Sequence, residues 1–211
     1  MKLDKRLTAV LEEIDASRVI DVGCDHGKLG VALLECGRAK ECVFLDISAD
    51  SLEKARTLST KHGYQDRSTF IVADGADYNW QDDDVIVVAG MGGNEIVKVL
   101  TSKSVPVGSV FVPHQDANVL REFFNSRDIT VSKDYVVKSK DKYYDILVVG
   151  KGEKFSDNEI FVGKNVPFSE YYESRIEERL KKISKYISGN VSENLMKEKE
   201  CLENAKAGRD N

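Results

Sequence analysis

Apolar and polar residues follow two spacings along this chain, and the spacing changes from one segment to the next. Between residues 4 and 15, Leu7, Val10, Leu11 and Ile14 recur three and four positions apart, which predicts an amphipathic helix. Short apolar runs then alternate with further helical spacings as far as about residue 124. Strands that alternate with helices are typical of an α/β protein built around a parallel sheet.

Five short apolar runs carry this part of the chain, and each leads into a polar or glycine-rich turn. The predicted strands are 19–22, 42–46, 69–73, 85–89 and 109–112. Helices are expected to end near Gly37 and Gly63 and to cover 95–100 and 119–124, and Ser48 is expected to cap the helix that ends near Gly63. The run 85–89 shows no alternation, which suits a parallel strand covered on both faces.

The pattern changes in the C-terminal part. Segments 129–137 and 143–149, joined by a polar turn, predict an antiparallel hairpin that closes one edge of the sheet. Gly150 to Lys154 reads as a boundary, so we expect a sheet domain over 1–152 and an extension over 153–211. Two helical seams in this extension predict a helical hairpin. Their apolar positions are Tyr172, Ile176, Leu180, Ile183 and Ile187, and then Val191, Leu195, Leu202 and Ala205.

Composition and charge narrow the class of protein. The 211 residues are 41% hydrophobic and 32% charged, enough for one domain with a substantial core and an appendage. No apolar run approaches the ~20 residues that span a membrane, and the N-terminus leads into a mixed-charge helix, so we expect a cytoplasmic protein. The formal net charge of −5 argues against a strongly basic nucleic-acid binder, although a local basic face can suffice. The four cysteines lack zinc-ligand spacing, so we expect reduced thiols and no metal site.

A glycine-punctuated turn follows the first predicted strand, at the end of the sheet where open parallel sheets bind their ligands. Gly23 and Gly27 permit backbone geometry and close ligand approach that a Cβ atom hinders. Asp46 ends the next strand, where its carboxylate can accept both ribose hydroxyls of a nucleoside-containing cofactor. Asp74-Gly75 ends the third strand and Gly90–Gly93 follows the fourth. Acids and glycines therefore collect at one edge of the predicted sheet.

The sign of the charge in the turn separates two cofactors. The nicotinamide dinucleotide fingerprint is G-x-G-x-x-G, but here Asp25 stands two positions after Gly23. A carboxylate facing a pyrophosphate would repel it. Asp21 and Asp25 instead suit a cofactor with positive groups, and S-adenosylmethionine has an amino group and a sulfonium. Asp74 can hold its adenine amino group, so the sequence favours S-adenosylmethionine.

Several motifs, taken in order, resemble a known family. The chain contains Leu3-Asp4-Lys5-Arg6-Leu7, Asp21-Val22-Gly23-Cys24-Asp25-His26, Ala73-Asp74-Gly75 and Ala89-Gly90-Met91-Gly92-Gly93. With Arg121-Glu122-Phe123 and Lys142–Val148, they resemble the bacterial tRNA adenine-N1 methyltransferases (TrmK), which methylate the adenosine at tRNA position 22. The likeness covers nearly the whole chain. One departure is His114-Gln115-Asp116, where that family usually has Gln-Pro-Asn.

The resemblance implies a class I methyltransferase fold with a Rossmann-like mixed sheet. It further implies an S-adenosylmethionine-binding domain over 1–152, a coiled-coil-like helical extension over 153–211, and tRNA as the substrate. The expected cofactor-binding residues lie at the strand ends and in the turns: Asp21, Gly23, Asp25, His26, Gly27, Asp46, Ile47, Asp74, Gly75, Ala89, Gly90 and Met91. The expected catalytic residues, near the methyl group, are Asp25, His26, Met91 and Gly92.

Methyl transfer from a sulfonium is an in-line displacement, and N1 of adenine already carries a lone pair, so no base is needed to expose it. Positioning the nucleophile, the methyl carbon and the sulfur in line can lower the activation barrier by ~7–11 kcal/mol. N1 lies on the Watson–Crick edge, so the base must first be displaced, and we expect loop Gly90–Asn94 to line its pocket. The expected tRNA contacts are Lys2, Lys5, Arg6, Lys28, Asn94 and Tyr144, with a second surface at Arg175, Arg179, Lys181, Lys182 and Lys185.

Other interpretations stay open at this point. Asp21 can simply buttress the turn, Gly23 and Gly27 can serve packing alone, and Asp-Gly is a common turn pair. His62 and His114 are more readily explained without chemistry. One alternative function is methylation of another RNA or of a small molecule. Another is a non-catalytic protein that keeps the cofactor fold and binds RNA through its helical arm.

Overall fold

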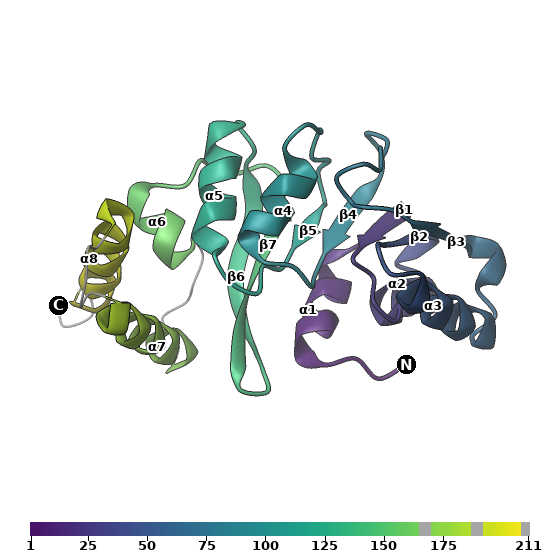
Figure 1. The fold of residues 1–211 in the computed structure, drawn as a ribbon, viewed down its shortest axis with the longest axis horizontal. Helices are drawn as coiled ribbons and strands as arrows, with labels where there is room; N and C mark the ends of the chain where they lie inside the picture. Colours follow the sequence, from purple (N-terminus) through teal and green to yellow (C-terminus); the bar gives the residue numbers. More distant parts are fainter. Residues whose placement is uncertain (165–169, 187–191, 208–211) are drawn as a thin grey trace.

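Seven strands form one mixed sheet in the order β3-β2-β1-β4-β5-β7-β6 (Figure 1). The computed structural model describes residues 1–164, 170–186 and 192–207. The strands are β1 (Ala16–Val22), β2 (Ala39–Asp46), β3 (Ser68–Val72), β4 (Val85–Val88), β5 (Val110–Phe111), β6 (Val131–Ser139) and β7 (Lys142–Val149). The first five pair in parallel, whereas β7 is antiparallel to both β5 and β6. The predicted hairpin and its place at the sheet edge are therefore confirmed.

Helices cover both faces of the sheet, so the core has two layers. The helices are α1 (Lys5–Glu13), α2 (Lys28–Glu35), α3 (Ala49–Lys61), α4 (Gly93–Leu100), α5 (Ala117–Ser126), α6 (Asp157–Val162), α7 (Glu170–Tyr186) and α8 (Glu193–Ala207), with a 3₁₀ turn at Gln65–Arg67 (η1). One layer packs α1, α2 and α3 on one face of the sheet, and the other packs α4 and α5 on the opposite face. In β4, Val87 belongs to the first layer and Val88 to the second, which explains its uninterrupted apolar run.

Local signals in the sequence set where several helices begin. The Ser48 hydroxyl accepts the Ser51 N–H at 3.2 Å and caps α3 as expected, while Asp4 caps α1 by accepting the Leu7 N–H at 2.9 Å. Helix α6 was not predicted from the sequence, because it is only six residues long and lies in a polar segment. A capping box between Ser156 and Glu159 starts it, and Phe161 anchors it in the interior.

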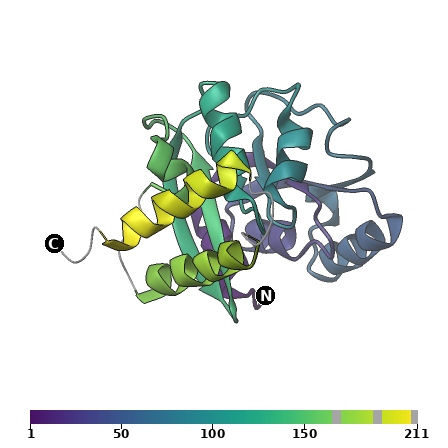
Figure 2. The same ribbon diagram turned by 60° about the vertical axis from the view of Figure 1, so that its left-hand side comes forward.

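The C-terminal helices α7 and α8 pack on each other and lie over the β6–β7 end of the sheet (Figure 2). Ile176, Ile183 and Leu202 form their shared apolar core. The predicted helical pairing is confirmed for these positions. The expected contributions of Ile187 and Val191, and of the Tyr172 side chain, lie outside the described residues.

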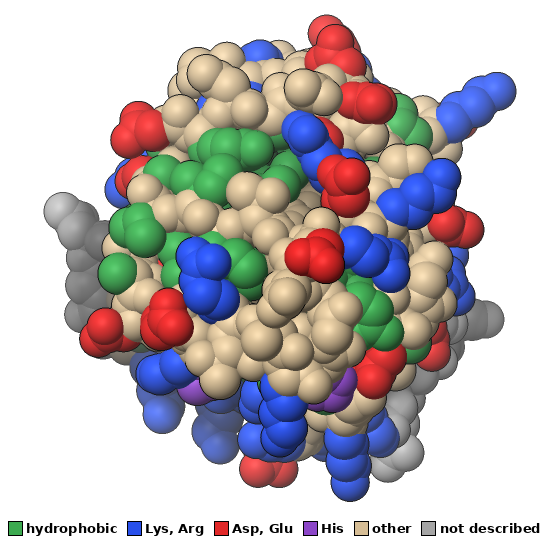
Figure 3. All heavy atoms as spheres, turned by 90° about the vertical axis from the view of Figure 1, so that its right-hand side faces the viewer, with side chains coloured by type: hydrophobic (Ala, Val, Ile, Leu, Met, Phe, Trp, Pro, Cys, Tyr) green, Lys and Arg blue, Asp and Glu red, His purple; other side chains and the backbone are tan. Residues whose placement is uncertain are grey.

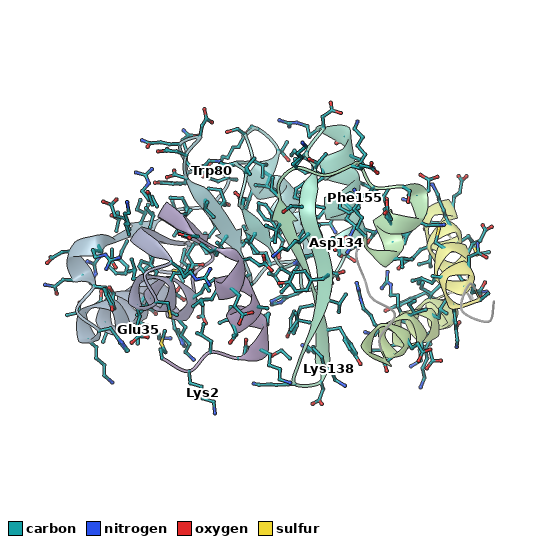
Figure 4. All side chains as sticks on the ribbon, turned by 180° about the vertical axis from the view of Figure 1, so that it is seen from behind. Lys2, Glu35, Trp80, Asp134, Lys138 and Phe155 are labelled. Atoms are coloured by element: carbon teal, nitrogen blue, oxygen red, sulfur yellow. The ribbon has the colours of Figure 1, made fainter. Side chains whose placement is uncertain are left out.

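A buried network of charges joins this extension to the sheet. The Arg121 side chain of α5 is fully buried and donates two hydrogen bonds of 2.9 Å to Asp134 of β6, which Figure 4 labels. Arg121 also donates to Asp145 of β7 at 2.6 Å, and Arg175 of α7 donates to the other oxygen of Asp145 at 2.5 Å. Two arginines and two aspartates thus tie four elements together, α5, β6, β7 and α7.

Candidate active site

The carboxyl ends of β1 and β4 open into a cavity of about 280 Å³ beside the start of α2. Eight of the residues expected from the sequence to bind cofactor, substrate or both line it. They are Arg6, Asp21, Gly23, Asp25, His26, Lys28, Ala89 and Gly90. The other expected residues are not part of its lining. Ile47, Asp46, Asp74 and Gly75 lie at the ends of β2 and β3, and Met91, Gly92 and Asn94 follow β4. Gly27 precedes α2, Lys2 and Lys5 lie at the start of the chain, and Tyr144 lies in β7. Parallel pairing of β3, β2, β1 and β4 brings these strand ends to one edge, as the sequence predicted.

Asp21 is the least satisfied polar group at this edge. Its side chain is buried, and among the described residues its Oδ2 atom has no hydrogen-bond partner. Burial raises the pKa of Asp21 to about 7, against a Gly30 backbone hydrogen bond that lowers it, and the nearby Asp46 and Asp25 charges add to the rise. A buried carboxylate in this state gains from any ligand that brings a positive group or a hydrogen-bond donor.

Asp46 is held in a fixed orientation by the turn that it faces. Its Oδ2 atom accepts the Asp25 N–H at 3.0 Å, and its Oδ1 atom accepts the Ser48 N–H at 2.9 Å. A carboxylate has about four acceptor positions, so both oxygens keep capacity for ligand hydroxyls. Ile47, the next residue, exposes 75% of its surface and offers an apolar patch beside this carboxylate. Asp74 is exposed, and its Oδ1 atom accepts the Ala76 N–H at 2.8 Å within its own turn.

Two of the expected glycines have a structural explanation in the packing. Gly27 has φ +68° and begins α2, and a Cβ atom there would lie 2.7 Å from the Ala55 Cβ. At Gly75, a Cβ atom would lie 2.6 Å from the Val22 side chain. Gly90 differs, because its nearest neighbour would be the Gly23 carbonyl at 3.8 Å. Space for a ligand is therefore open at Gly90 rather than at the two packed glycines.

The loop after β4 is fixed by the segment that follows β5. The Met91 carbonyl accepts the His114 N–H and the Gly93 N–H donates to the Gln115 carbonyl, both at 2.9 Å. The Asn94 amide donates to Asp116 at 3.2 Å. The loop Gly90–Asn94, expected from the sequence to line the pocket of the acceptor base, is therefore held by three hydrogen bonds to residues 114–116.

Arg6, His114 and Tyr144 form a cluster at the edge of the cavity, which we call the junction cluster. The Arg6 Nη1 atom donates to the Ala89 carbonyl at 2.6 Å and lies 2.9 Å from His114 Nε2. The guanidinium carbon of Arg6 lies 5.2 Å from the centre of the Tyr144 ring, and the Tyr144 and His114 rings meet edge to face at 5.8 Å. The sequence pointed to Arg6 and Tyr144 but gave His114 no role, because their meeting depends on residues more than 100 positions apart.

A second, larger cavity of about 620 Å³ lies beyond the junction cluster. It is bounded by β7, the start of α5 and the C-terminal helices, and Tyr144, Arg175, Arg179 and Lys182 are among its lining residues. These basic residues are already paired with acids: Arg175 with Asp145, Arg179 with Glu198, and Lys182 with Glu178. The C-terminal helices thus present a mixed-charge wall rather than a purely basic one.

The expected lysine contacts lie on the surface. Lys2, Lys5 and Lys28 are exposed, and Lys2 reaches the lower margin of the molecule in Figure 4, where Lys138 of the hairpin also lies. Lys and Arg side chains gather along the lower margin of the face in Figure 3. Within residues 1–164, 170–186 and 192–207, no group of His, Cys, Asp and Glu side chains is arranged to hold a metal ion. In the same ranges, no helix combines the length and apolar character needed to cross a bilayer.

The sequence of this chain matches a family model and two known proteins. Residues 3–147, more than half of the chain, match a family model described as a methyltransferase domain. A candidate tRNA methyltransferase from Mycoplasma pneumoniae is 31% identical over 135 residues, which are 62% of this chain and 62% of that protein. A candidate tRNA methyltransferase from Mycoplasma genitalium is 25% identical over 161 residues, 72% of each chain. The alignment therefore spans less than two thirds of the first of these relatives.

Solved structures share the whole architecture. The TrmK m1A22 tRNA methyltransferase of B. subtilis has a TM-score of 0.79 at 21% identity, with 97% of this chain and 95% of that chain covered. M. capricolum TrmK, solved with S-adenosylhomocysteine, has a TM-score of 0.81 at 19% identity, with 100% and 97% covered. The expected class I methyltransferase fold, with its C-terminal helices, is thereby confirmed. This chain belongs to the methyltransferase-domain family.

Proposed function

We propose that this protein transfers a methyl group from S-adenosylmethionine to N1 of an adenosine in tRNA, at position 22. The observation that carries the proposal is Asp21, a buried carboxylate at the ligand-binding edge of a methyltransferase-domain fold, with one oxygen that has no partner in the described part of the chain. Support for tRNA as the substrate comes from the relatives named as tRNA methyltransferases and from the matching structures named as m1A22 enzymes. A Streptococcus pneumoniae protein of the same fold was solved in complex with S-adenosyl-L-methionine, and this supports S-adenosylmethionine as the donor.

The residues at the edge fit this donor by charge and by shape. Asp21 and Asp25 would face its positive groups, and the fixed carboxylate of Asp46 would accept the ribose hydroxyls. The exposed Ile47 side chain would pack against the adenine, and Asp74 would accept from its amino group. When bound, S-adenosylmethionine supplies a methyl carbon made electrophilic by the sulfonium. With the donor bound, Gly23, Gly27, Gly75, Ala89 and Gly90 would allow close backbone approach or hold the turns in place.

On the acceptor side, the protein's task is to hold the base in line. The wall formed by His26, Met91 and Gly92 would exclude water from the approach path of N1. The methylated base is cationic, and the exposed carboxylate of Asp25 would stabilise the charge as it develops. No side chain has to remove a proton from N1, so orientation is the main contribution. We assign donor binding to the domain 1–152 and RNA contact in part to the extension 153–211.

A methylation assay on unmodified tRNA tests the function directly. The protein is incubated with labelled donor and tRNA, and the digested product is analysed by mass spectrometry for 1-methyladenosine. Because a methyl group on N1 blocks the Watson–Crick edge, primer extension should stop next to position 22. Methyl transfer to a different nucleotide or to a small molecule would replace the proposed substrate. Binding of tRNA without donor binding would contradict an enzymatic role.

Salt dependence tests the expected lysine contacts. If Lys2, Lys5 and Lys28 contact phosphates, tRNA affinity should fall at least about tenfold between 50 and 200 mM salt, since each contact releases a counterion. The double variant Lys2→Glu/Lys5→Glu should flatten the plot of log affinity against log salt. Lys61→Glu, in the last turn of α3, is the matched control and should keep the slope. Equal slopes in both variants would remove these lysines from the interface.

A further inference from the structure

Among the described residues that line the two cavities, His114 is common to both. It borders the 280 Å³ cavity at the ends of β1 and β4, and it also borders the 620 Å³ cavity beside the C-terminal helices. His114 therefore lies where the two cavities adjoin.

Two elements contact the imidazole, and a third segment anchors the backbone of His114. Its backbone N–H is bonded to the Met91 carbonyl of the loop after β4. Arg6 of α1 lies 2.9 Å from Nε2, and Tyr144 of β7 packs against the ring. Although the side chain is exposed toward the cavities, these contacts fix its direction. A ring that two elements contact, on an anchored backbone, is preorganised rather than free to rotate.

The contact with Arg6 determines which ring nitrogen carries the proton. A guanidinium has donors and no acceptor, so the His114 Nε2 atom must offer its lone pair and the proton must sit on Nδ1. Partial burial against its neighbours lowers the pKa of His114, and the positive charges of Arg6 and Lys142 lower it further, against the Ala89 carbonyl and Glu95. At neutral pH the side chain is therefore a neutral imidazole that presents Nδ1–H as a donor.

We propose that His114 positions the acceptor base, an unpaired purine of RNA that crosses from the larger cavity to the smaller one. The inference deepens the proposed function and rests on it. Arg6, Tyr144 and the imidazole are the kinds of planar side chain that stack on displaced bases, and Nδ1–H adds one directional hydrogen bond. His114 fixes the orientation of the base, while the donor is held by the acids at the strand ends.

Protonation of His114 would break this arrangement. An imidazolium has no lone pair for Arg6, and two positive groups 2.9 Å apart repel each other. The groups facing the ring include Arg6 from α1, Lys142 and Tyr144 from β7, and Glu95 from α4, and the two cations outweigh the carboxylate of Glu95. Acceptor positioning should therefore fail on the acid side of neutrality, independently of donor binding.

Two variants and one control test the inference with tRNA at saturating donor. His114→Ala should lower kcat/KM for tRNA at least tenfold at pH 8 and leave the donor Kd within twofold. His114→Gln keeps an acceptor and a donor without titrating, so it should stay within threefold of the unaltered protein at pH 8 and lose less activity at pH 5.5. His62→Gln is the control, because His62 pairs with Glu35 and lines neither cavity.

The donor Kd is measured at every pH, so that the titration of Asp21 is separated from that of His114. The inference is overturned if His114→Ala matches His62→Gln in kcat/KM for tRNA. It is also overturned if His114→Ala loses donor affinity in proportion to activity, or if His114→Gln keeps the full acid-side loss. Absence of tRNA methylation by the unaltered protein contradicts the proposed function, and this inference with it. Normal methylation with unaffected variants contradicts this inference alone.

Discussion

Arg121→Met should lower the free energy of unfolding by about 3–5 kcal/mol, because it leaves the buried Asp134 carboxylate without its cation and removes one of the two arginines that bind Asp145. Arg121 and Asp134 are both fully buried, and two hydrogen bonds of 2.9 Å join them. Although burial raises the pKa of Asp145, the Arg175 and Arg121 guanidinium groups more than offset this and hold that pKa below its usual range. Without Arg121, Asp134 has no ion-pair partner among the described residues, since Arg175 reaches only Asp145.

Denaturant unfolding of the variant measures this loss, and Arg127→Met is the matched control. Arg127 caps the end of the same helix, but its side chain is exposed and donates to the Thr101 carbonyl. We expect the control to change stability by no more than about 1 kcal/mol. A loss of that size in Arg121→Met as well would show that water reaches the two carboxylates. Because Asp145 also binds Arg175 of α7, the full loss should be accompanied by increased proteolysis of the extension.

Asp21→Asn should abolish detectable donor binding while it stabilises the ligand-free protein above neutral pH. The folded pKa of Asp21, about 7, lies above its unfolded value, so the folded state favours the protonated acid. The stability contributed by this group is complete below about pH 4 and is lost as the pH rises through 7. The asparagine does not ionise. The difference in unfolding free energy between the variant and the unaltered protein should therefore increase by on the order of 2–3 kcal/mol from pH 5 to pH 8.

Thermal unfolding at the two pH values measures the stability difference, and titration calorimetry measures donor affinity. A cationic donor favours the ionised carboxylate, so the affinity of the unaltered protein should increase as the pH rises to about 7 and then level off. Asp66→Asn, at an exposed position in η1, should show neither change. Donor binding by Asp21→Asn within threefold of the unaltered protein would remove Asp21 from the donor site.

The opposite effects of Asp21→Asn on the stability of the empty protein and on donor binding have a common cause. A buried acid that lacks a partner costs stability in the empty protein, and the same acid gains most when a positive ligand arrives. Strain of this kind is stored where a ligand binds and is offset by packing elsewhere. In this protein the offset comes from the two apolar layers that cover both faces of the sheet.

Local features of the sequence determined the fold and the acidic edge of the candidate site. Apolar spacing predicted the central strands and most helices, because burial on a helix or strand face depends on residues close in sequence. The acids Asp21, Asp46 and Asp74 could be placed together for the same reason: each lies at or next to the carboxyl end of a strand, and parallel strands end at one edge. The short helix α6 was missed because its capping box is a weak local signal.

Only the tertiary structure decided which distant residues meet. Arg6, His114 and Tyr144 come from three separate elements, and no local pattern marks His114 as their partner. The same holds for Arg121, whose burial depends on acids that arrive with β6 and β7. It also holds for Gly27 and Gly75, which pack against Ala55 and Val22. Periodicity records which face of an element is buried, whereas the neighbour on that face is fixed only when the elements pack.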